Sequence, residues 1–271
     1  MQKIDSISAV ADRYDLIVFD QFGVLHNGSA PYPFAVQAIE ALQAGGSTLA
    51  VLSNSGKSGA LNRQRITGMG FPADAFGVVM TSGEALRLDV QHGPLSALRE
   101  VYAMTAAQGD AEAWSDGLNL AFTDDLSQAE AVLLMGIPDA DDHPAERAVL
   151  EKARGLGKPL ICSNPDRKAP RADGRLVESP GALAHDYADA GGEVLFYGKP
   201  HPPVFEALLV QIDSRPARVL MVGDSPEHDI SGGKTAGWDT LFISGGIHAG
   251  HDPATLFAPD ARPDYILTSL R

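Results

Sequence analysis

Four apolar, strand-like segments of the chain are each followed by polar side chains that could do chemistry. In chain order these side chains are Asp20, the pair Ser53 and Asn54, Lys199, and Asp224 with Asp229 a few residues further on. The carboxyl ends of parallel strands meet at one edge of a sheet, and ligands of open α/β sheets bind there. A carboxylate nucleophile, hydroxyl and amide donors, one cation and two more carboxylates would then share one site. Phosphoryl transfer through an aspartyl phosphate requires such a set.

Each of these side chains has an expected role at such a site. Asp20 and Asp224 are expected to bind Mg²⁺, because this ion prefers oxygen ligands and keeps several waters. Asp229 is expected to hold a metal-bound water or Lys199. Lys199 would keep Asp20 ionised and let it approach an anionic substrate. Taken alone, Ser53 and Asn54 could equally cap a helix, and Asp229 could be a helix-terminal charge stabilised by the helix dipole. The prediction of a phosphoryl-transfer site therefore depends on all of these residues together.

Strands and helices alternate along the chain, which predicts parallel sheets with right-handed crossovers. The expected strands are 16–19, 48–52, 78–80, 100–104, 118–122, 131–135, 159–162, 194–197, 218–222, 240–243 and an edge strand at 265–267. The expected helices are 33–44, 59–69, 84–89, 111–114, 143–154, 180–190, 204–211 and one that follows residue 229 and ends near 236. Residues 167–178 are expected to be an irregular loop. The pattern restarts near residue 91, which suggests an insertion. We therefore expect an α/β protein whose Rossmann-like parallel-sheet core, residues 1–83 and 182–271, carries an inserted α/β cap domain, residues 84–181.

Composition excludes several classes of partner. The chain has 271 residues, of which 44% are hydrophobic, so it can bury a large core. Its formal net charge of −14 argues against nucleic acid or an anionic membrane as a partner, and no apolar run approaches the length of a membrane span. The single cysteine, Cys162, allows no intrachain disulfide and fits a reducing cytoplasm. The sequence indicates no oligomeric state.

The motifs resemble those of the haloacid dehalogenase superfamily. The resemblance is to its class IIA, whose large α/β cap lies between the second and third motifs and which includes p-nitrophenyl phosphatase-like and pyridoxal phosphate phosphatase-like proteins. It rests on residues 20–24, 52–55, 163–166, 198–200 and 223–230, and it covers essentially the whole chain.

This resemblance implies a role for each motif residue. Asp20 is the nucleophile, and Mg²⁺ is bound by Asp20, Asp224 and the backbone carbonyl of Phe22. The phosphate is held by Ser53, Asn54 and Lys199. Asn164 and Asp166 of the cap lie on the substrate side. The implied substrate is a small phosphorylated metabolite.

One residue departs from the family pattern. Phosphatases of the family carry a second Asp two residues after the nucleophile, as general acid and base, whereas this chain has Phe22. Because such help is worth roughly 10²–10⁴-fold, a phosphatase without it would be slow. The alternative is a phosphate-binding protein with little or no turnover. Dehalogenation is disfavoured because the metal-binding motif is retained. His26 could replace the acid, although a loop histidine is the simpler interpretation, and Glu227 and His228 are weaker candidates.

Overall fold

The structure is a computed structural model that describes residues 1–140, 142–170 and 176–271. It divides into two compact units. The first unit comprises Met1–Ser53, Gly59–Met80 and Lys199–Arg271, and the second comprises Asn54–Ser58 and Thr81–Gly198. Among the described residues, no helix is both long and apolar enough to cross a membrane.

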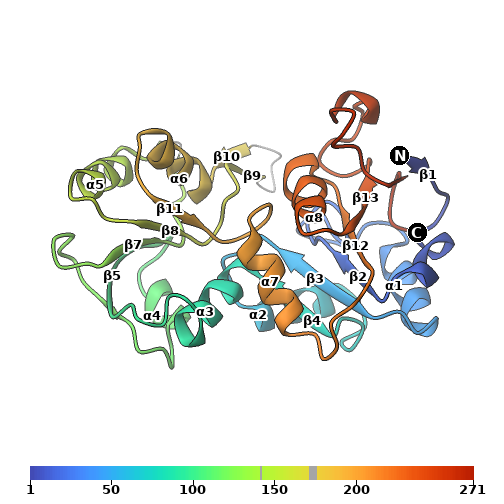
Figure 1. The fold of residues 1–271 in the computed structure, drawn as a ribbon, viewed down its shortest axis with the longest axis horizontal. Helices are drawn as coiled ribbons and strands as arrows, with labels where there is room; N and C mark the ends of the chain where they lie inside the picture. Colours follow the sequence, from blue (N-terminus) through green and yellow to red (C-terminus); the bar gives the residue numbers. More distant parts are fainter. Residues whose placement is uncertain (141, 171–175) are drawn as a thin grey trace. The chain divides into compact units, whose positions relative to one another are not determined.

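The sheet of the first unit brings together strands from both ends of the chain (Figure 1). Its central strands are parallel, and Phe19 pairs with both Val222 and Val51. Every position of β2, β3 and β12 is buried, which explains why these segments are apolar runs without alternation. The strand order is β1 (Gln2–Lys3), β14 (Tyr265–Leu267), β13 (Asp239–Ile243), β12 (Val219–Gly223), β2 (Leu16–Phe19), β3 (Leu49–Ser53) and β4 (Val78–Thr81).

Helices of the first unit follow from apolar spacing and from their end residues. In α1 (Ala35–Ala44), Ala35, Ala38, Ile39 and Leu42 are buried, so one helix face packs on the core. Prolines occupy the start of α7 (Pro202–Val210), where a missing N–H costs nothing. The unit also contains α2 (Gly59–Gly68), α8 (Gly232–Thr235), a π-helical segment (Pro226–Ser231) and 3₁₀ turns at Ile7–Ala9, Ala11–Arg13 and Pro253–Thr255.

The second unit has its own parallel sheet and core. The strand order is β11 (Val194–Phe196), β8 (Leu160–Cys162), β7 (Ala131–Leu134), β5 (Glu100–Met104) and β6 (Ala121–Phe122). Val132, Leu160 and Leu183 belong to one buried apolar cluster, so the sheet packs against α6. The helices are α3 (Ser82–His92), α4 (Asp110–Trp114), α5 (Pro144–Gly155) and α6 (Pro180–Asp189).

The predicted α/β class is confirmed, but three details differ. β11 pairs with β8, with Val194 opposite Leu160, so α6 and β11 belong to the second unit and not to a core resuming at residue 182. Part of the expected loop 167–178 forms an antiparallel pair, β9 (Lys168–Pro170) with β10 (Leu176–Glu178), while 171–175 lie outside the described residues. β14 is not an edge strand, because β1 pairs with it.

Candidate active site

Neighbouring strands of the first unit place two carboxylates together. β2 ends one residue before Asp20 and β12 ends one residue before Asp224, and the paired residues Phe19 and Val222 set the two side chains at the same sheet edge. The backbone beyond Asp20 approaches Asp224 closely. A Cβ on Gly23, whose φ is +93°, would lie 1.9 Å from Asp224 Oδ2, so only glycine fits there.

Lys199 links two carboxylates of this cluster. Its Nζ donates to Asp20 Oδ1 and to Asp229 Oδ1, each over 2.6 Å. The other oxygen of Asp229 accepts from the Ser225 N–H over 2.9 Å, which orients the carboxylate. Lys199 is 2% exposed, Asp229 1% and Asp20 9%, so these charges meet away from bulk water.

Burial and mutual repulsion shift the acidity of the cluster. Burial raises the pKa of Asp20 to about 7, although the positive charge of Lys199 opposes the shift. Burial, together with repulsion by Asp20 and Asp229, raises the pKa of Asp224 to about 8. Burial disfavours the Lys199 ammonium, but its two carboxylate partners outweigh this and raise its pKa. Lys199 alone therefore does not offset the cost of ionising all three carboxyl groups, and a bound cation would favour their ionised forms.

The three carboxylates fit a divalent metal. Ligand oxygens of Asp20, Asp224 and Asp229 all lie within 4.8 Å of one another. Asp224 Oδ2 also accepts from the Ile247 N–H over 2.6 Å, which fixes its orientation. An all-oxygen donor set of this kind suits Mg²⁺. The Phe22 carbonyl immediately precedes Gly23 in the turn that touches Asp224, and its part as a metal ligand stays a prediction.

Sequence reasoning missed the Ile247 backbone as part of this site. Its signal was present, because Gly245 and Gly246 directly follow Ser244 at the end of β13. A Cβ on Gly246 would lie 2.1 Å from Asp224 Oδ2, so this glycine lets the chain pass the carboxylate. Tyr32 was also missed. Burial and the charge of Asp224 raise the pKa of its phenol.

The predicted phosphate loop lies where the chain passes from the first unit to the second. Ser53 is the last residue of β3 and is 7% exposed, and Asn54 is the first residue of the second unit. The Asn54 amide donates from Nδ2 to Asp166 Oδ1 over 2.7 Å. Asn164 Oδ1 accepts from the Asp166 N–H over 3.0 Å. The structure thus joins one predicted phosphate-binding residue to the two predicted cap residues.

The environment of Phe22 bears on the missing acid. The Phe22 ring lies edge-on to the His26 ring, with centroids 6.4 Å apart. His26 Nδ1 accepts from the Gly28 N–H over 3.1 Å, and burial and Arg65 lower the His26 pKa to about 4. Near neutral pH, His26 is therefore uncharged and carries its proton on Nε2, which favours the structural interpretation of this residue. Glu227 is exposed.

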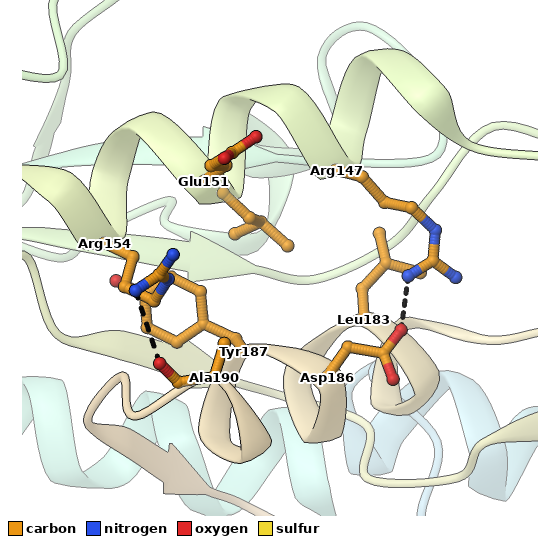
Figure 2. Close-up of a pocket in the computed structure, with 8 residues that line it drawn as sticks. Arg147, Glu151, Arg154, Leu183, Asp186, Tyr187 and Ala190 are labelled. Atoms are coloured by element: carbon orange, nitrogen blue, oxygen red, sulfur yellow. Dashed lines mark hydrogen bonds and ion pairs between the residues drawn. The ribbon is translucent and has the colours of Figure 1, made fainter.

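A separate pocket lies between α5 and α6 of the second unit (Figure 2). It has a volume of about 220 Å³ and contains none of the predicted site residues. Arg147 bonds to Asp186 and Glu178, and Arg154 donates to the Ala190 carbonyl, so both arginines are engaged by the protein itself. The pocket is lined by Arg147, Leu150, Glu151, Arg154, Leu183, Asp186, Tyr187 and Ala190.

The chain is similar to known haloacid dehalogenase-like proteins along almost its whole length. The family profile of haloacid dehalogenase-like hydrolases matches residues 17–117, and a HAD-hydrolase-like profile matches residues 196–271. Bovine chronophin is 30% identical over 96% of this chain and 92% of its own length. The chain belongs to the haloacid dehalogenase-like hydrolases. Within them it falls in class IIA, and it is an enzyme of the phosphatase type.

Other relatives cover the chain equally well. Chicken glycerol-3-phosphate phosphatase is 28% identical over 98% of this chain and 93% of its own length. Sugar-phosphatase AraL of Bacillus subtilis is 26% identical, with 94% and 90% covered. A haloacid dehalogenase-like hydrolase from Brucella suis matches in structure with a TM-score of 0.82 and 31% identity, covering 99% of this chain and all of that one.

Proposed function

We propose that this enzyme hydrolyses the phosphate ester of a small metabolite, with Mg²⁺ and through an aspartyl phosphate on Asp20. The observation that carries the proposal is the buried ammonium of Lys199, bonded to Asp20 and Asp229 with Asp224 alongside. A structural ion pair would be complete with one carboxylate. Three carboxylates around one cation leave an excess of negative charge that suits a metal ion next to a nucleophile.

Each residue then has a task in the reaction. Mg²⁺, when held by Asp20, Asp224 and the Phe22 carbonyl, would neutralise charge on the phosphate. Lys199 adds a second positive charge and lowers the repulsion between Asp20 and the substrate. One oxygen of Asp20 attacks phosphorus, and the leaving oxygen departs with the electrons of the P–O bond and takes a proton from water to give the alcohol. Water then hydrolyses the aspartyl phosphate and regenerates Asp20.

Two parts of the chain would form the substrate site. Ser53 and Asn54 would donate to the phosphate oxygens. Asn164 and Asp166 would lie on the substrate side of the cap, which we place within the second unit. The names of the relatives, among them glycerol-3-phosphate and sugar phosphatases, suggest a small polyol or sugar phosphate as substrate. The single cysteine, which allows no intrachain disulfide, supports the reducing cytoplasm as its compartment.

Phe22 sets an expected limit on the rate. It cannot protonate the leaving alcohol, and His26 is neutral with its basic nitrogen already occupied. The enzyme should therefore hydrolyse p-nitrophenyl phosphate, whose leaving group needs little protonation, faster than an alkyl phosphate. The aspartyl phosphate on Asp20 should accumulate, because its hydrolysis also needs an activated water.

The decisive experiment measures turnover of p-nitrophenyl phosphate, glycerol 3-phosphate and a set of sugar phosphates with and without Mg²⁺. Asp20→Asn should abolish turnover. Phe22→Asp should raise it by about 10-fold or more on the alkyl esters. Equal rates of the wild-type enzyme on aryl and alkyl esters would show that another group supplies the proton. Phosphate binding without turnover in both wild type and Phe22→Asp would favour the alternative, a phosphate-binding protein.

A further inference from the structure

Asp166 accepts a hydrogen bond from Asn54, the residue that follows Ser53. Asn54 Nδ2 donates to Asp166 Oδ1 over 2.7 Å, and Asn54 is only 8% exposed. The Asp166 N–H donates in turn to Asn164 Oδ1 over 3.0 Å, which closes a turn of the Asn-Pro-Asp segment. The carboxylate is thereby aimed at the Asn54 amide, and a hydrogen bond to a carboxylate is stronger than one between neutral groups.

The same segment packs against the residue that precedes Lys199. Gly198 has a φ of +111°, and a Cβ there would lie 2.6 Å from Pro165 Cδ and 2.9 Å from Asn54 Oδ1. Asn54, Pro165, Asp166 and Gly198 thus form one contact cluster, which we call the loop junction. Along the chain, Asn54 directly follows Ser53 and Gly198 directly precedes Lys199, the two other predicted phosphate-binding residues.

The backbone after Asn54 is already fixed by other contacts of the second unit. Ser55 O accepts from Ser82 Oγ over 2.9 Å and from the Gly83 N–H over 3.1 Å, and Lys57 O accepts from Thr81 Oγ1 over 2.6 Å. The hydrogen bond to Asp166 also fixes the orientation of the Asn54 side chain. It sets the amide with Nδ2 toward the carboxylate and Oδ1 beside Gly198.

We propose that Asp166 is a positioning residue of the phosphate site, acting through Asn54, and that it does not bind the alcohol part of the substrate directly. The proposal rests on the proposed function for the identity of the anion. It predicts that loss of the Asp166 carboxylate weakens binding of the phosphate group whatever alcohol is attached to it. Direct contact with the alcohol predicts the opposite, an effect that differs between esters and vanishes for inorganic phosphate.

Calorimetric titration of inorganic phosphate into the full chain with Mg²⁺ separates these alternatives. Asp166→Ala should weaken phosphate binding about 10-fold, the scale of one hydrogen bond to a charged group. Asp166→Asn keeps an acceptor oxygen and should stay within about threefold of wild type. Combining Asn54→Ala with Asp166→Ala should cost no more than the worse single change, because both remove the same bond.

Asp186→Ala is the matched control, since it removes a carboxylate of the same unit whose partner is Arg147 (Figure 2). It should leave phosphate affinity unchanged.

Wild-type phosphate affinity in Asp166→Ala, with a raised KM for only some esters, would overturn the inference and leave the phosphatase intact. Additive losses in the double variant would overturn it as well. If Asp166→Ala fails to fold, Asp166→Ser takes its place, because a serine side chain is too short to keep the bond to Asn54. It should weaken phosphate binding as Asp166→Ala would, and unchanged phosphate affinity in it would overturn the inference. Failure of the proposed function shows separately, as turnover that survives Asp20→Asn.

Discussion

Replacing Lys199 by methionine tests the electrostatic logic of the site. The ammonium lies 2.6 Å from one oxygen of Asp20 and 2.6 Å from one of Asp229. At an effective dielectric constant of about 20, each pair corresponds to about 6 kcal/mol of attraction. Much of that attraction offsets the cost of burying the charges. Removing one partner of a buried ion pair lowers the free energy of unfolding by about 3–5 kcal/mol, and we expect a loss of this size.

The expected loss depends on pH in a defined direction. Without Lys199, Asp20 loses the positive charge that opposes the rise of its pKa, so the folded variant binds a proton at pH values where the unfolded chain does not. Stability of the variant therefore rises as the pH falls, and the difference from wild type should be larger at pH 8 than at pH 5. Urea unfolding with a chelator present, at both pH values, measures this difference.

Two further variants make the test of Lys199 specific. Lys199→Arg keeps the charge and should lose less stability than Lys199→Met. Lys152→Met removes an exposed lysine of α5 and should change the free energy of unfolding by less than about 0.5 kcal/mol. A loss below about 1 kcal/mol for Lys199→Met at pH 8, or an equal loss at both pH values, would refute the electrostatic reasoning.

Three other outcomes are expected. Asp224→Asn should weaken Mg²⁺ binding measured by calorimetry, and unchanged affinity would remove Asp224 from the metal site. In the folded wild-type protein, the pKa is about 7 for Asp20 and about 8 for Asp224, above the value of about 4 in the unfolded chain. With a chelator present, the free energy of unfolding should therefore fall as the pH rises from about 4 to 8. Added Mg²⁺ should reverse that fall, and a flat pH profile in chelator would contradict it. Gly198→Ala should lower the melting temperature more than Gly191→Ala, because both have positive φ but only Gly198 has atoms where the Cβ would go. Equal decreases in melting temperature would show that only the backbone strain at positive φ acts, and not the close contacts of Gly198.

The sequence by itself determined the chemistry and the class of fold. Fully apolar runs such as 16–19 predict strands buried on both faces, and a polar residue directly after such a run must lie at a sheet edge. That reasoning alone brought Asp20 and Asp224 together. It also identified Phe22 as the residue that separates this chain from its family's pattern, because a side chain's ability to carry a proton is a property of its type.

Only the tertiary structure decided which sheet each element joins and which polar groups bond. The helix–strand alternation is the same in both units, so no local pattern could assign α6 and β11 to the second unit. That assignment depends on strand pairing between distant segments, here Val194 with Leu160. The bond from Asn54 to Asp166 likewise joins residues 112 positions apart. The sequence offered Lys199 as a partner of Asp20 and, as one of two alternatives, of Asp229, but only the tertiary structure shows that Lys199 bonds to both carboxylates at once.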